Sequence, residues 1–155
     1  MLSVYMGARK RKLSGLLLVG GVLLSLVLCT FPILYNRLTL LVFSQRLFGY
    51  PLPPDTEVIS RQMQVGVLTG NGNHCDFLAS MLLRTTLGKQ EIEAYYEDVT
   101  FPSVGENSTM AAMSGLDGVL PVLLEFDPAN SEYVTVKLLD GIYTDWPRML
   151  DGSCH

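Results

Sequence analysis

The stretch LSGLLLVGGVLLSLVLCTFPILYN, residues 13–36, decides the architecture of this chain. It carries no charged side chain over 24 residues, and most of its residues are Leu, Val, Ile or Gly. A helix of that length reaches roughly 36 Å at about 1.5 Å per residue, whereas the hydrocarbon core of a bilayer is about 30 Å thick. The sequence therefore predicts one transmembrane helix at 13–36.

Basic residues on either side of this segment predict its orientation. Four consecutive basic residues, Arg9 to Lys12, come directly before it, whereas only Arg37 and Arg46 follow closely. The positive-inside rule then places the tail 1–12 in the cytoplasm and the rest of the chain outside the cell membrane. We expect the basic tail to contact the anionic lipid headgroups of the cytoplasmic leaflet of the bilayer.

A cleaved secretory signal is the alternative interpretation, because such signals also combine a basic start with an apolar run. Their apolar region usually spans about 7–15 residues and ends at a small-residue cleavage site. The uncharged run here is longer, and no such site follows it. The pattern favours an uncleaved signal-anchor and a single-pass protein.

The net charge of −4 is unevenly distributed and excludes some functions. Residues 1–50 carry six basic and no acidic side chains, whereas residues 51–155 carry five basic and all fifteen acidic ones. An acidic outer domain does not suit nucleic-acid binding, which depends on neutralising phosphates. Three cysteines are too few for a disulfide-stapled miniprotein or a four-cysteine zinc site. We expect no nucleic-acid partner, no metal and no cofactor.

Residues 37–54 are predicted to join the membrane segment to the outer domain. The part from Leu38 to Phe48 either continues the helix along the membrane interface, with Arg46 reaching the headgroups, or forms a stalk. Pro51, Pro53 and Pro54 then end any helix and form a stiff spacer.

The outer domain, residues 55–155, is predicted to be α+β, with two helices packed on an antiparallel sheet. Asn73 and Asp76 suit a helix start, and apolar residues at i, i+1, i+4 and i+5 follow them, namely Phe77, Leu78, Met81 and Leu82. The expected helices lie at 73–87 and 89–98. The expected strands lie at 57–60, 65–68, 119–126 (interrupted at Pro121), 133–138 and 142–146, the last one short. The expected connections are a long loop at 101–118 and turns at 127–130 and 140–141.

The most distinctive local feature connects the second strand to the first helix. It consists of Gly70, Asn71, Gly72, Asn73, His74, Cys75 and Asp76. One interpretation is purely structural, with the glycines forming a turn and Asn73 and Asp76 capping the helix. A second is a ligand-binding loop whose backbone N–H groups hold an anion. A third is a reactive thiol at Cys75.

Cys75 also has a candidate disulfide partner, Cys154, because both would lie in an oxidising compartment. Two unrelated free thiols are the alternative, since a terminal cysteine is often poorly ordered. Cys154 and His155 form a second adjacent Cys/His pair, in the opposite order to His74 and Cys75. Adjacent residues rarely direct both side chains at one metal, so the two Cys/His pairs do not indicate a metal site.

Catalytic patterns are weak in this sequence. Glu91, Glu93, Glu97 and Asp98 fit the solvated face of a helix, and no Ser-His-Asp, HExxH or glycosidase pattern is present. The sequence therefore favours an acidic ligand- or partner-binding domain displayed outside the membrane over an enzyme. The alternatives are a thiol-dependent enzyme or redox module that uses Cys75, and a structural subunit of a membrane complex.

Three stretches carry a resemblance to known proteins: PLPPDTE at 51–57, GNGNHCDF at 70–77 and EIEAYY at 91–96. They are similar to segments of small membrane-anchored bacterial proteins. The resemblance covers the linker and the first half of the outer domain. It implies an origin but no particular activity.

Overall fold

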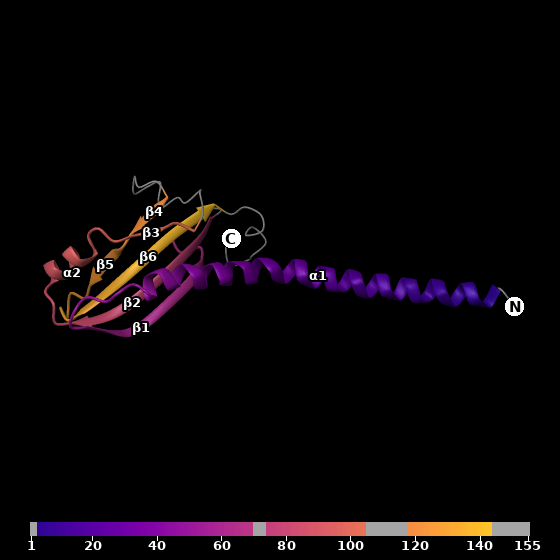
Figure 1. Cartoon of the computed structure of the whole chain (residues 1–155), viewed down its shortest axis with the longest axis horizontal. Helices are drawn as coiled ribbons and strands as arrows, with labels where there is room; N and C mark the ends of the chain where they lie inside the picture. The colour runs from indigo at the N-terminus through magenta and orange to yellow at the C-terminus, as the bar shows by residue number, and fades with distance from the viewer. Residues whose placement is uncertain (1–2, 70–73, 105–117, 144–155) are drawn as a thin grey trace.

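The computed structural model describes residues 3–69, 74–104 and 118–143, in which a long N-terminal helix leads into a sheet domain (Figure 1). The elements in chain order are α1 (Ser3–Phe48), β1 (Thr56–Gly66), β2 (His74–Thr85), α2 (Lys89–Tyr96), β3 (Thr100–Pro102), β4 (Val119–Pro121), β5 (Leu123–Phe126) and β6 (Tyr133–Tyr143). The α+β class predicted from the sequence is confirmed.

The N-terminal part of α1 stands apart from the rest of the chain. Every side chain from Val19 to Phe31 is exposed, although most of these residues are apolar. A bare apolar surface around a whole helix is unfavourable in water and suits lipid. By length and composition, α1 is a helix that can cross a membrane.

The C-terminal part of α1 belongs to the domain core. Leu40, Phe43 and Leu47 are fully buried on one face of the helix, and the Phe43 ring centroid lies 6.1 Å from that of Phe77 in β2. The helix therefore continues to Phe48, and the stalk interpretation is wrong. Arg46 does not reach for headgroups, because its guanidinium donates to the carbonyl oxygens of Pro102 and Ser103.

The main sheet is antiparallel with the strand order β1-β2-β6-β5, and β3 pairs separately with β4. The central pair, β2 and β6, runs from the partners His74 and Tyr143 to the partners Arg84 and Tyr133. The strands expected at 57–60 and 65–68 are one strand, β1, with a bulge between Val58 and Ser60.

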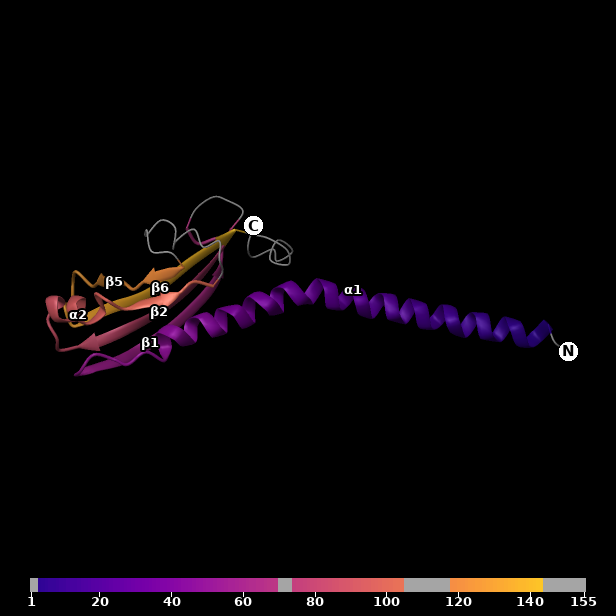
Figure 2. The same ribbon diagram turned by 45° about the horizontal axis from the view of Figure 1, so that its top comes forward.

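Both helices cover the same face of this sheet, as Figure 2 shows for α1 beneath β1 and β2. Alternate side chains of β2 and β6 point into the layer between the sheet and the helices. The buried members are Cys75, Phe77, Ala79, Met81, Leu83, Val134, Val136 and Leu138. α2 adds Ile92 and Tyr96 to this core. The other face of the sheet carries half-buried and polar side chains.

The helix predicted at 73–87 is wrong, because these residues form β2. The apolar residues in this segment match helical spacing because β2 carries large apolar side chains on both faces. Phe77 and Met81 are buried on the helix-covered face of the sheet, and Leu78 and Leu82 are half-buried on the opposite, open face. As a central strand, β2 forms ladders with β1 and β6 on its two edges. Long-range pairing outweighs the local helical pattern here.

Other elements follow the sequence more closely. The second helix is confirmed as α2. The predicted strand at 119–126 is divided directly after Pro121, at Val122, into β4 and β5. The predicted turn at 127–130 lies in the loop between β5 and β6, which is closed by a bond from the Asp127 N–H to the Tyr133 carbonyl. The turn predicted at 140–141 is wrong, because both residues lie within β6. Asp140 remains in the strand, and its carboxylate accepts a 2.6 Å hydrogen bond from the Val104 N–H.

Candidate functional site

The predicted loop at 70–76 is only partly described. Gly70, Asn71, Gly72 and Asn73 lie outside the described residues, and His74 is the first residue of β2. Whether this loop binds a ligand therefore stays a prediction. The predicted helix cap at Asn73 and Asp76 is wrong, since Asp76 lies within a strand.

Asp76 has a structural task at the start of β2. Its side chain is buried, and Oδ2 accepts hydrogen bonds from the N–H groups of Leu68 and Thr69, both at 2.7 Å, and from the Thr69 hydroxyl at 2.8 Å. A carboxylate that satisfies several donors fixes the chain where it leaves β1. Asp76 thus holds one end of the connection between β1 and β2.

Cys75 is enclosed in the core. Its side chain is fully buried, its strand partner in β6 is Ile142, and it is disulfide-bonded. Buried structural cysteines are chemically inert in comparison with exposed low-pKa thiolates. Cys154 lies outside the described residues, so the predicted pairing with Cys75 stays a prediction.

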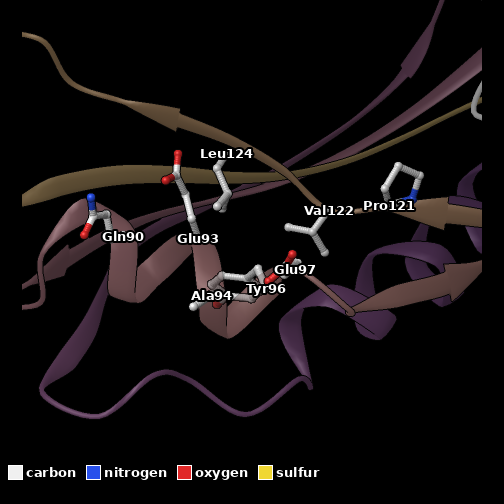
Figure 3. A pocket seen from close by; sticks show the side chains of 8 residues that line it. All are labelled: Gln90, Glu93, Ala94, Tyr96, Glu97, Pro121, Val122 and Leu124. Atoms are coloured by element: carbon white, nitrogen blue, oxygen red, sulfur yellow. The ribbon is translucent and has the colours of Figure 1, made fainter.

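A cleft of about 450 Å³ lies between α2 and the strands β4 and β5 (Figure 3). One wall is α2, and the other is the chain from Pro121 to Leu124. The lining residues are Gln90, Glu93, Ala94, Tyr96, Glu97, Pro121, Val122 and Leu124. Its volume falls within the range of about 300–1,000 Å³ that is usual for ligand sites.

Local interactions fix the helical wall. The Glu91 side chain accepts a 2.7 Å hydrogen bond from the Gly88 N–H at the start of α2, and the Thr85 hydroxyl accepts one from the Leu87 N–H. Ile92 and Tyr96 anchor the helix in the core. Glu93 and, one turn later, the C-cap residue Glu97 are therefore exposed at the cleft.

The opposite wall is apolar and includes a strand edge that has no partner among the described strands. Pro121, Val122 and Leu124 are half-buried, and Val122 lies where the chain passes from the β3–β4 pair into the main sheet. β5 is the last strand of that sheet and pairs only with β6 among the described strands. Its outer edge thus offers backbone donors and acceptors beside the cleft.

Tyr96 lines the cleft, and its hydroxyl group is buried without a hydrogen-bond partner among the described residues. The residue is 3% exposed. Burial, followed by the neighbouring Tyr95 and Tyr50, raises the pKa of Tyr96 above its ordinary value of 10.0. The Tyr95 hydroxyl, in contrast, donates to the Pro51 carbonyl at 3.1 Å, and its pKa is raised by burial and by Tyr50.

These tyrosines form an aromatic cluster, defined as Tyr50, Tyr95, Tyr96 and Phe101. Their ring centroids lie 5.0 to 6.3 Å apart in tilted and edge-to-face arrangements. Such pairs add to the energy of apolar burial. The cluster joins the segment directly after α1 to α2 and β3, so the helical wall of the cleft is packed against the rest of the domain.

The electrostatics of the cleft are acidic. Glu93 lies 3.6 Å from Lys89 in an exposed i,i+4 pair, which contributes little free energy. Glu97 has no ion-pair partner within the part of the chain that the structure describes. The Lys89 ammonium also lies 5.2 Å from the centre of the Phe126 ring. An acidic wall facing an apolar wall suits an occupant that is both basic and apolar.

Sequence reasoning missed this cleft. It placed Glu93 and Glu97 on a solvated helix face, which is confirmed, but it did not place them beside a cleft. Only the long-range packing of β4 and β5 against α2 turns these residues into one wall of a cleft. Within residues 3–69, 74–104 and 118–143, no three His, Cys, Asp or Glu side chains gather as a metal site.

Comparisons with protein-family models, with curated proteins and with solved structures find no match for this chain.

Proposed function

We propose that this chain is a single-pass membrane protein whose outer domain binds an extended basic segment of a partner protein in the cleft between α2 and β5. The observation that carries the proposal is the pairing of an acidic wall with an apolar wall beside an unpaired strand edge. Strand addition at a sheet edge is a common way to bind extended peptides.

The location of the domain follows from the helix and the charges. The bare apolar part of α1 supports membrane insertion, and the basic residues Arg9 to Lys12 support a cytoplasmic N-terminus in contact with anionic headgroups. The sheet domain then lies outside the membrane. The buried, disulfide-bonded state of Cys75 fits that oxidising side and gives thiol catalysis no support.

The chemistry of the occupant follows from the cleft walls. Lys or Arg side chains of the segment pair with Glu93 and Glu97, and alternate apolar side chains contact Val122 and Leu124. The backbone of the segment bonds to the outer edge of β5. The buried hydroxyl of Tyr96 supports a polar contact at the base once a ligand opens access to it.

Peptide binding to the full chain in nanodiscs tests this proposal. The probe is a fluorescent peptide of alternating Lys and Val residues, compared with one of alternating Glu and Val residues. The test variant is Glu93→Gln combined with Glu97→Gln, and the matched control is Asp98→Asn, an exposed acid that does not line the cleft.

Two exposed ion pairs at roughly 0.2–1 kcal/mol each correspond to a loss of affinity of about 2- to 30-fold. We expect that loss for the double variant, and no change for Asp98→Asn. We also expect the Glu-Val peptide not to bind. Equal affinity of the double variant and the control, or equal binding of the two peptides, would overturn the proposal.

A further inference from the structure

α1 has two different faces where it meets the domain. Pro32, Asn36, Leu40, Phe43 and Leu47 are buried on the face that carries the sheet. On the opposite face, Leu38, Leu41 and Val42 are 54%, 43% and 63% exposed. We call these three residues the underside patch.

The underside patch continues the apolar surface of the membrane segment. Leu34 and Phe31 are exposed one and two turns earlier on the same side of α1, and the first polar residue after the patch on that side is Gln45. Arg37, which is exposed beside the patch, has no ion-pair partner within the described part of the chain. An apolar face bordered by a free cation suits a layer that contains both acyl chains and phosphates.

The position of the patch along the helix agrees with this environment. If the hydrocarbon core ends near Asn36, Leu38 lies about 3 Å and Val42 about 9 Å further along the axis at 1.5 Å per residue. The headgroup region adds roughly 5–8 Å on each side of the core. Leu38 and Leu41 therefore fall at headgroup depth in an upright helix, and Val42 does so in a tilted one.

The two faces leave the membrane at different heights, which implies a tilt. The sheet-bearing face is covered by protein from Pro32, whereas the underside stays apolar to Val42, about 15 Å further along a helix roughly 10–12 Å wide. An offset of this size calls for a tilt at the upper end of the observed range, which reaches about 40°, together with a bend in the helix. Figure 2 shows α1 bending between its N-terminal half and the part under the sheet, and Pro32 lies within the helix.

We propose that α1 leaves the outer leaflet tilted, with Leu38, Leu41 and Val42 embedded in the phospholipid headgroup layer and the sheet carried on its upper side. The inference rests on the membrane insertion proposed above. It adds a lipid-contacting surface to the outer domain and fixes the height at which the cleft is held. The occupant of the patch is the lipid surface rather than a second copy of the chain.

Spin labels on the full chain in phosphatidylcholine vesicles test this inference. Single cysteines replace Val27, Val42, Gln45 or Glu132 in a Cys29→Ala background, because Cys29 is exposed whereas Cys75 is buried and disulfide-bonded. Collision of each label with oxygen, which concentrates in lipid, is compared with collision with a water-soluble nickel chelate. Val27 reports the membrane interior, and Glu132 reports water.

We expect the Val42 label to meet oxygen more often, and the nickel chelate several-fold less often, than the Gln45 and Glu132 labels do. A Val42 label as accessible to nickel as Glu132, with Val27 still in lipid, overturns this inference and leaves the membrane span intact. A Val27 label in water overturns the span itself. Dipolar broadening at Val42 that disappears on dilution with unlabelled chain shows that a second copy covers the patch and also overturns the inference.

Discussion

Replacing Phe43 by Ala tests the contact that joins α1 to the sheet. Phe43 is fully buried, and its ring meets that of Phe77 edge-to-face at 6.1 Å. Removing a buried Phe side chain typically costs about 3–5 kcal/mol, which includes the cavity that it leaves. Because domains are stable by only about 5–15 kcal/mol, this change removes a large share of the free energy of unfolding.

Pulse proteolysis of the full chain in detergent micelles measures this loss, because only the unfolded domain is cleaved. At a slope of about 2 kcal/mol per molar urea, the midpoint of Phe43→Ala falls by roughly 1.5–2.5 M. The matched control is Val42→Ala, one residue away on the exposed side of α1. A surface change stays within about 0.5 kcal/mol, or about 0.25 M urea.

A double-mutant cycle with Phe77→Ala separates the ring contact from general packing. We expect a coupling free energy of about 0.5–1.5 kcal/mol between the two rings. If the midpoint of Phe43→Ala lies within about 0.25 M urea of the Val42→Ala midpoint, the helix does not pack on the sheet as described.

Two further substitutions test the buried polar groups of the domain. Tyr96→Phe removes a hydroxyl that has no hydrogen-bond partner among the described residues, so stability at neutral pH should stay equal or rise by up to about 1 kcal/mol. Above pH 10.0 an unfolded tyrosine ionises while folded Tyr96 stays protonated, so the free energy of unfolding of the wild type falls as pH rises. Urea titrations at alkaline pH should therefore show a smaller loss for the variant. An equal dependence of the free energy of unfolding on pH in the two proteins would contradict this. Asp76→Ala leaves the Leu68 and Thr69 donors without their acceptor, so it should lower the free energy of unfolding by about 2–4 kcal/mol in the same assay. A loss below about 0.5 kcal/mol would show that Asp76 does not hold the connection between β1 and β2.

The long apolar helix that can span a membrane was predictable because its signal is local. An uncharged run of 24 residues needs no knowledge of the rest of the chain, and neither does the end of the helix before Pro51. The helix α2 was also predictable, since the cap by Glu91 and the buried pair Ile92 and Tyr96 lie within eight residues. The turn at 127–130 followed from its Asp-Pro-Ala-Asn sequence for the same reason.

The identity of β2 was not predictable from local pattern. Phe77, Leu78, Met81 and Leu82 lie on one stripe of a helix, yet in the sheet Phe77 and Met81 face the core while Leu78 and Leu82 lie on the open face. A strand with apolar side chains on both faces loses the alternation that identifies a strand. Its partners are β1 and β6, and its pairings with β6 span 49 to 69 residues of sequence.

The cleft was unpredictable for a related reason. Glu93 and Glu97 carry the same helical spacing whether they face water or a cleft, and nothing within α2 distinguishes the two. The distinction comes from Val122 and Leu124, which reach α2 only because Pro121 separates β4 from β5 and lets each pair with a different strand. The sequence did reveal that break, but not the element it would bring alongside.

The same limit explains why the packing of the end of α1 on the sheet was not predicted. Apolar residues after Arg37 look alike whether they face lipid or protein, because both environments exclude water. The structure divides them: Leu40 and Phe43 face the sheet, whereas Leu41 and Val42 do not. A helix shared in this way cannot turn about its axis without exposing one apolar face to water, so the proposed membrane insertion would hold the sheet at a fixed rotation and height above the bilayer. If the cleft binds a partner segment, that segment must approach at the height which α1 sets.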